Sequence, residues 1–151
     1  MNREKKLKVI SKSGVTLDDL VDVAIRNVTE RTKIADPLEI LTGSQCYFVL
    51  KVYDLEPCSL TDIARKAKIS KPSASAMVNK LVNKKILIRQ ENPECRREVV
   101  ISTTPDTKKY IKQVDDEIIV LLDKIAGKMS PEEFEWWYKI SLKINEIVTD
   151  D

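Results

Sequence analysis

Ten lysine and arginine residues lie between positions 59 and 97, against three aspartate and glutamate residues. Such a local surplus of positive charge attracts the phosphate backbone of nucleic acids. Serine hydroxyls and an asparagine amide recur in the same stretch, and these groups can bond to the edges of bases in the major groove. The sequence therefore predicts a DNA-binding site composed of Ser70, Lys71, Ser73, Ser75, Asn79, Lys80, Arg89, Arg96 and Arg97.

The polar and the cationic members of this set have different predicted roles. Contacts with phosphates position a protein on the duplex, whereas contacts with base edges carry the sequence information. We expect Ser73, Ser75 and Asn79 to lie nearest the bases. The side chains expected to anchor phosphates or to enter the minor groove are Lys71, Lys80, Arg89, Arg96 and Arg97.

The residue types argue against most catalytic chemistry. The chain contains no histidine, the most common general base and zinc ligand. Its three cysteines, at positions 46, 58 and 95, have the spacing of neither a disulfide framework nor a metal site. No carboxylate pair has a spacing that would make it converge in a cleft. We therefore predict that the protein is not an enzyme and needs neither a cofactor nor a metal.

Two short helices should carry the basic segment. Ser59 can cap a helix whose small residues Ala64 and Ala67 allow a second helix to cross close by. After the turn Lys68-Ile69-Ser70, Ser70 can cap that second helix, and Pro72 is tolerated in its first turn. The buried stripe of the second helix is expected to be Ala74, Met77, Val78 and Leu81.

A β-hairpin should follow these helices. Ile86-Leu87-Ile88 and Val99-Val100-Ile101 are β-rich runs on either side of the turn residues Glu91-Asn92-Pro93-Glu94. Arg96 and Arg97 would lie at the hairpin tip. The predicted fold is mainly α-helical with a small hairpin wing, in which a winged helix-turn-helix core is flanked by N- and C-terminal dimerisation helices.

The flanking segments have helix signals of their own. Thr16 can cap a first helix that ends before Asp36-Pro37, and Thr42 with Gln45 forms a capping box for a second. Downstream, Thr104-Pro105 opens a long helix that ends at Gly127, and Ser130-Pro131-Glu132-Glu133 starts the last one. Their apolar stripes are expected to be buried, and those of the last two helices include Tyr110, Ile111, Val114, Ile118, Ile119, Leu121, Leu122, Ile125, Phe134, Trp137, Ile140, Ile144, Ile147 and Val148.

These signals divide the chain into regions. Residues 1–15 are predicted to form a polar, basic N-terminal arm, residues 16–35 and 104–151 the helical dimerisation region, and residues 42–103 the DNA-binding lobe. Residues 98–151 hold seven basic against twelve acidic residues, so this part should face away from a duplex. The 151 residues fit one compact domain without a signal peptide or membrane span, and we expect a cytoplasmic protein that does not bind membranes.

The order of these elements resembles the MarR-type winged-helix transcriptional regulators over nearly the whole chain. The resemblance is carried by Ser59-Leu60-Thr61-Asp62-Ile63-Ala64, by Ile69-Ser70-Lys71-Pro72-Ser73 and by Thr103-Thr104 at the exit from the wing. It implies an obligate homodimer that binds a pseudo-palindromic operator in double-stranded DNA, acts as a repressor, and releases DNA when a small-molecule effector binds. The sequence departs from the family pattern at Ala76, Lys85 and Cys95, where an arginine, a glycine and an aspartate are usual.

Two other functions are compatible with the same residues. A winged-helix module can bind a protein partner, in which case the basic face would meet an acidic protein. A thiol-based regulator could sense oxidants through Cys95, because the neighbouring Arg96 and Arg97 would favour the thiolate.

Overall fold

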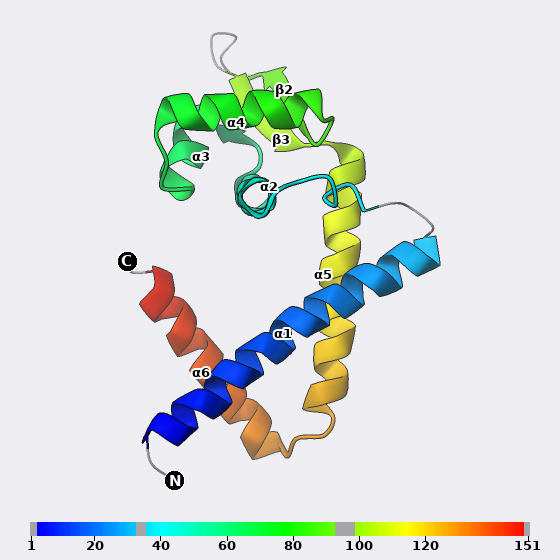
Figure 1. Cartoon of the computed structure of the whole chain (residues 1–151), viewed down its shortest axis with the longest axis vertical. Helices are drawn as coiled ribbons and strands as arrows, with labels where there is room; N and C mark the ends of the chain where they lie inside the picture. Colours follow the sequence, from blue (N-terminus) through cyan, green and yellow to red (C-terminus); the bar gives the residue numbers. More distant parts are fainter. Residues whose placement is uncertain (1–2, 33–35, 93–98, 150–151) are drawn as a thin grey trace. The chain divides into compact units, whose positions relative to one another are not determined.

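The structure of the chain is a computed structural model that describes residues 3–32, 36–92 and 99–149. Six helices and three strands are described, and Figure 1 shows their arrangement. In chain order they are α1 (Arg3–Thr32), α2 (Gly43–Leu55), β1 (Cys58–Ser59), α3 (Leu60–Lys66), α4 (Lys71–Asn83), β2 (Leu87–Glu91), β3 (Val99–Thr103), α5 (Pro105–Ala126) and α6 (Pro131–Thr149). The predicted fold class, mainly helical with a small β wing, is confirmed.

The chain folds into two compact units. One unit combines the chain up to Val28 with the chain from Val114 onward, and the other spans Thr29–Gln113. We call the first the helical unit and the second the winged unit. Helices α1 and α5 each contribute residues to both.

Local capping explains where the helices of the winged unit begin. Thr42 and Gln45 form the predicted capping box of α2, in which each side chain bonds to the backbone of the other residue. The Ser59 hydroxyl accepts a hydrogen bond from the Asp62 amide at 3.1 Å, and the Ser70 hydroxyl accepts one from the Ser73 amide at 3.2 Å. Each bond satisfies a backbone donor that has no partner within its helix, which fixes the starts of α3 and α4.

Helices α3 and α4 end in the same way, each with a lysine in the left-handed region. Lys68 has a φ of 53° and Lys85 a φ of 59°. The amide of Ile69 donates to the Ala64 carbonyl and the amide of Ile86 to the Leu81 carbonyl, both at 3.0 Å. These are the long bonds of the Schellman motif, which usually places glycine where the two lysines stand.

The conformation of Lys85 leads to a stability prediction. A residue with a Cβ is destabilised by roughly 1–2 kcal/mol in the left-handed region, and glycine removes this strain. Glycine also gives the unfolded chain more conformational entropy, which offsets part of the gain in stability. Lys85→Gly is therefore expected to raise the free energy of unfolding by about 0.5–1 kcal/mol, measured by urea titration. Lys84→Gly is the matched control, because Lys84 has a φ of −80° and its ammonium donates to the Ile40 carbonyl at 2.9 Å. The control should be destabilised, and equal effects in both variants would contradict the explanation.

The wing is a three-stranded antiparallel sheet with the order β1-β3-β2. The hairpin of β2 and β3 was predicted, but β1 was not, because this two-residue strand exists only through its pairing with β3. Cys58 pairs with Ile101, and on the other side of β3 Ile101 pairs with Arg89. Ile101 is therefore the central residue of the sheet, and its side chain is buried.

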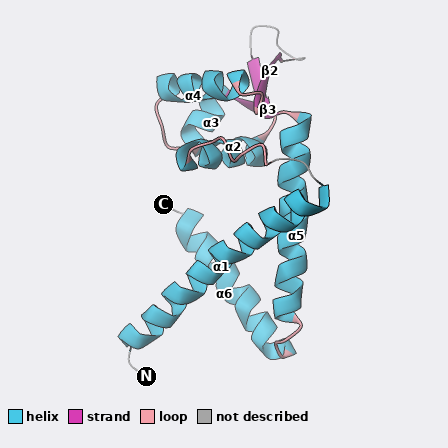
Figure 2. Cartoon of the chain, turned by 45° about the vertical axis from the view of Figure 1, so that its right-hand side comes forward, coloured by secondary structure: helices cyan, strands magenta, loops and turns pink. Residues whose placement is uncertain are grey.

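The core of the winged unit lies between its helices and the wing (Figure 2). Helix α3 contacts both α2 and α4, and α4 contacts β2. The buried residues of α2 are Phe48, Val49 and Val52. The predicted buried stripe of α4 is confirmed, except that Met77 is only partly buried. The buried cluster consists of Phe48, Val49, Val52, Cys58, Ile63, Ala64, Ala74, Val78, Leu81, Ile86, Leu87, Ile101 and Ile111.

Helix α1 begins earlier than predicted. We expected a helix from Thr16, but α1 already begins at Arg3. The first turns are rich in residues with high helix propensity, and Glu4 and Lys8 form an ion pair at 2.8 Å one turn apart. Gly14 costs roughly 1 kcal/mol in a helix interior, which does not end a helix of 30 residues.

The helical unit leaves much of its predicted apolar stripe exposed. Ile119 on α5 is 65% exposed, and on α6 Ile140 is 57% and Ile144 is 54% exposed. The expectation that these residues are buried is wrong for a single chain, as it is for Phe134 and Ile147. The caps themselves are as predicted, since the Ser130 amide donates to the Glu133 carboxylate at 2.8 Å.

Within the described residues, no helix is both long and apolar enough to cross a membrane.

Candidate nucleic-acid interface

Helix α4 presents most of the predicted site on one exposed surface. Ala74, Val78 and Leu81 are buried beneath it, which fixes the rotation of the helix. The exposed predicted residues are Ser70 at the N-cap, Lys71, Ser73, Asn79 and Lys80, whereas Ser75 is half-buried. The helix therefore exposes hydroxyl, amide and ammonium groups to solvent on the side opposite its buried apolar residues.

The two serines at the start of α4 are already engaged with each other. Their hydroxyl oxygens lie 2.8 Å apart, and the Ser70 hydroxyl also accepts the Ser73 amide. A hydroxyl can donate one bond and accept two, so both serines keep capacity for a further partner. This arrangement holds the N-terminus of α4 in one conformation without consuming its polar groups.

Not every cation of the basic segment is equally available. Besides its bond to Ile40, the ammonium of Lys84 donates to the Gln45 side chain at 3.1 Å, so this lysine ties α4 to the start of α2. Arg65 lies 3.7 Å from Asp62 in an exposed ion pair. The charge count of the sequence thus overstates the number of cations that can contact phosphates freely.

Arg89 reaches from β2 to the surface of α4. Its Nη1 donates to the Asn79 Oδ1 at 3.0 Å. Both side chains are exposed, yet their backbones belong to elements anchored in the core. A bond between these two predicted residues was not foreseen, because residues ten positions apart reveal no contact until the helix and sheet are packed together.

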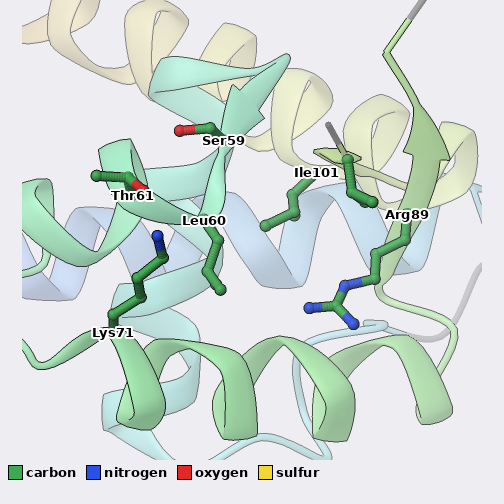
Figure 3. A pocket seen from close by; sticks show the side chains of 7 residues that line it. Ser59, Leu60, Thr61, Lys71, Arg89 and Ile101 are labelled. Atoms are coloured by element: carbon green, nitrogen blue, oxygen red, sulfur yellow. The ribbon is translucent and has the colours of Figure 1, made fainter. Parts of the chain in front are cut away.

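A hollow of about 380 Å³ lies beside Arg89, between the start of α3, the start of α4 and the sheet. Figure 3 shows the Lys71 and Arg89 side chains on its border, with Leu60 and Ile101 between them. Ser59 and Thr61, which also line it, were not predicted as site residues. In the sequence, Ser59 was recognised as a helix cap and both residues as part of the segment that carries the family resemblance, but neither was recognised as part of a binding site.

The tip of the wing lies outside the described residues. The predicted phosphate contacts Arg96 and Arg97, and the predicted redox residue Cys95, belong to this segment. Their roles stay predictions.

The other cysteines do not have the environment of a reactive thiol. Burial raises the pKa of Cys58 to about 11, and burial also raises the pKa of Cys46. Both therefore stay protonated near neutral pH, and the thiolate is the reactive form. The described residues contain no group of three or more histidine, cysteine, aspartate or glutamate side chains arranged to hold a metal ion.

A buried carboxylate fixes the base of the wing. Glu56 Oε2 accepts the Thr103 amide at 2.6 Å and the Thr103 hydroxyl at 2.7 Å, while Oε1 pairs with the Lys108 ammonium at 2.8 Å. Burial raises the pKa of Glu56, but the hydrogen bonds from Lys108 and Thr103 outweigh it and hold this pKa below its ordinary value. The carboxylate thus joins the end of α2, the end of β3 and the start of α5.

In this geometry the second helix of a helix-turn-helix, α4, exposes a polar surface and is flanked by a wing, which agrees with the family resemblance. Residues 41–99 match the model of the MarR family. The resemblance is therefore confirmed, and the match covers α2 through the start of β3. No curated protein sequence is significantly similar to the chain.

Solved structures extend the likeness beyond this MarR-type region. A MarR-like transcriptional regulator from Thermotoga maritima superposes with a TM-score of 0.73 at 16% identity, covering 99% of this chain and 98% of that one. Streptococcus pneumoniae FabT in complex with DNA gives 0.71 at 12% identity and coverages of 96% and 98%. S. aureus MepR bound to ethidium bromide gives 0.63 at 16% identity and coverages of 99% and 96%. The chain has the fold of MarR-type regulators along nearly its entire length.

Proposed function

We propose that the protein is a homodimeric transcriptional repressor that binds a pseudo-palindromic operator through α4 and the wing. The observation that carries this proposal is the exposed surface of α4, which presents Asn79 and the cations Lys71 and Lys80 while the opposite side of the helix is buried in the core. The residues that bind DNA are then the predicted set, with Ser73, Ser75 and Asn79 nearest the bases. Such a protein is not an enzyme, and it acts in the cytoplasm.

The exposed apolar surface of the helical unit supports a homodimer. Soluble monomers rarely expose continuous apolar patches larger than a few hundred Å². Here large apolar side chains are exposed on α1, α5 and α6, including Val21, Ile119, Val120, Phe134, Trp136, Ile140, Ile144 and Ile147. A second copy of the chain supplies the same surface, so residues 16–35 and 104–151 would form the dimerisation region and residues 42–103 the DNA-binding lobe.

Two relatives in fold support the remaining parts of the proposal. FabT has been solved in complex with DNA, and MepR has been solved with ethidium bromide. We infer by analogy that this protein binds double-stranded DNA and that a small-molecule effector releases it.

Selection of bound sequences from random duplex DNA tests the proposal. A dimer with two recognition helices should enrich inverted half-sites whose centres lie about one helical turn, roughly 10 base pairs, apart. Footprinting on the enriched duplex should protect both half-sites. If the protein enriches no sequence and binds an acidic protein partner instead, the winged-helix interaction module is the better explanation.

Lys80→Ala should weaken binding to every duplex, because an exposed ammonium on α4 is expected to contact a phosphate. The slope of log affinity against log salt should flatten by roughly one unit for each phosphate that the variant no longer neutralises. The measurement is a salt series with operator and scrambled duplex. Lys143→Ala removes the same charge from α6 and should leave the slope unchanged. An unaltered slope in Lys80→Ala would remove this lysine from the interface.

A further inference from the structure

Ala76 lies on the side of α4 that faces directly away from the core. Ala74 and Val78 are fully buried, and Ala76 lies two residues from each of them. Two residues correspond to about 200° of rotation around an α-helix, so the Cβ of Ala76 is on the side opposite both buried side chains. The exposure of the residues agrees with this placement, since Ala76 is exposed while its neighbours Ser75 and Met77 are half-buried.

The exposed side chains around Ala76 are polar or charged. Ser73 lies three residues before Ala76 and Asn79 three residues after it, so the three side chains are neighbours on the helix surface. Lys71 and Lys80 lie toward the two ends of α4. When a helix lies in the major groove, cations near its ends can contact phosphates while its middle lies over the base pairs. Ala76 therefore lies where a contact with a base is expected, and it presents only a methyl group there.

The chemistry of the major groove offers one feature that matches a methyl group. Adenine, guanine and cytosine present hydrogen-bonding groups along their edges, whereas thymine also presents its C5-methyl group. A methyl group placed against a donor or an acceptor would displace water without replacing its hydrogen bond, which costs free energy. Two methyl groups in contact remove each other's apolar surface from water, which favours binding.

We propose that Ala76 is a specificity-determining residue, whose methyl group packs against the C5-methyl group of a thymine at one position of each half-site. This inference rests on the proposed DNA-binding function and deepens it by adding an apolar contact to the polar ones. The short side chain of Ala76 also allows the backbone of α4 to approach the groove closely, which contact between two methyl groups requires.

The test uses duplexes in which deoxyuridine replaces one thymine at a time. Deoxyuridine pairs with adenine as thymine does and lacks only the C5-methyl group. The operator is first selected from random duplexes with the full-length protein, and each thymine of its half-sites is then replaced in turn. We expect one position in each half-site at which the replacement raises the Kd of wild type about fourfold, the effect of leaving one methyl group unburied. Ala76→Gly, which lacks the methyl group of the protein, should bind the thymine and the deoxyuridine duplex at that position with equal affinity.

Asn83→Gly is the matched control, because it also introduces a glycine at an exposed position of α4. This variant should keep the difference between the two duplexes, and loss of the difference would overturn the inference, because a more flexible helix would then explain the result. If wild type binds every deoxyuridine duplex as tightly as the operator, or if Ala76→Gly keeps the difference, Ala76 contacts no thymine methyl group. The inference is then overturned while the proposed function stands. If wild type selects no sequence at all, the proposed function fails, and this inference fails with it.

Discussion

Replacing Glu56 by alanine is expected to lower the free energy of unfolding by about 3 kcal/mol. The Glu56 side chain is 5% exposed, and its loss would leave the amide and the hydroxyl of Thr103 without their acceptor. A buried donor that loses its partner costs roughly 1–3 kcal/mol, whereas the Lys108 side chain is 60% exposed, so the loss of its partner adds little to this cost. Urea denaturation followed by circular dichroism measures the loss. Asp54→Ala, which removes an exposed carboxylate from the last turn of α2, should cost less than about 0.5 kcal/mol.

The lowered pKa of Glu56 adds a dependence on pH. Because the folded pKa lies below the ordinary value of 4.5, the unfolded chain takes up the proton first as the solution is acidified. The stabilisation by this carboxylate is therefore complete above the unfolded pKa and is lost as the pH falls through the folded pKa. Glu56→Gln keeps the size of the side chain but cannot ionise, so its stability should change less than that of wild type over this range. Parallel stability curves for the two proteins would show that Glu56 has the same pKa in the folded and the unfolded chain, which would contradict this prediction.

Placing glutamate at both Ile140 and Ile144 is expected to convert the proposed dimer to a monomer. The two residues lie one turn apart on α6 and are more than half exposed in the single chain, so charges there should not disturb folding of one copy. In a dimer interface the same charges would be buried without partners. An uncompensated buried charge costs roughly 3–5 kcal/mol, so Kd for dimerisation should rise at least about a thousandfold. Sedimentation at micromolar concentration measures the change.

The control for this prediction lies on the opposite side of α6. Glu135→Lys changes the charge by two and breaks only the exposed ion pair with Lys139 at 3.4 Å. This variant should remain a dimer. A monomeric wild-type protein, or a dimeric double glutamate variant, would contradict the assignment of this surface to the interface.

Local signals in the sequence were sufficient to predict most of the winged unit. Ser59, Ser70 and the Thr42–Gln45 pair bond to backbone amides within three residues, so the information for each helix start lies beside it in the chain. The surface of α4 could be predicted for the same reason, since helical periodicity alone separates Asn79 from Val78. The start of α1 was missed because the first cap considered in the sequence was Thr16, well inside the helix.

Features that depend on distant segments were not predictable in this way. Strand β1 consists of two residues, and its pairing with β3 joins Cys58 to Ile101 across 43 positions. The Arg89–Asn79 bond could be predicted only if the packing of β2 against α4 were already known. The apolar stripe of α6 was recognised, but periodicity cannot distinguish a face covered by the same chain from one left open, as Ile140 and Ile144 are here.

The two lysines that end α3 and α4 in the left-handed region set a limit on engineering this protein. A designer who follows the usual Schellman pattern would place glycine at Lys68 and Lys85 and would obtain a more heat-resistant lobe. In the proposed repressor the same design would delete two exposed positive charges from each DNA-binding lobe. Thermal stability and occupancy of the operator would therefore move in opposite directions, and a stabilised version would need compensating cations at positions with ordinary backbone angles.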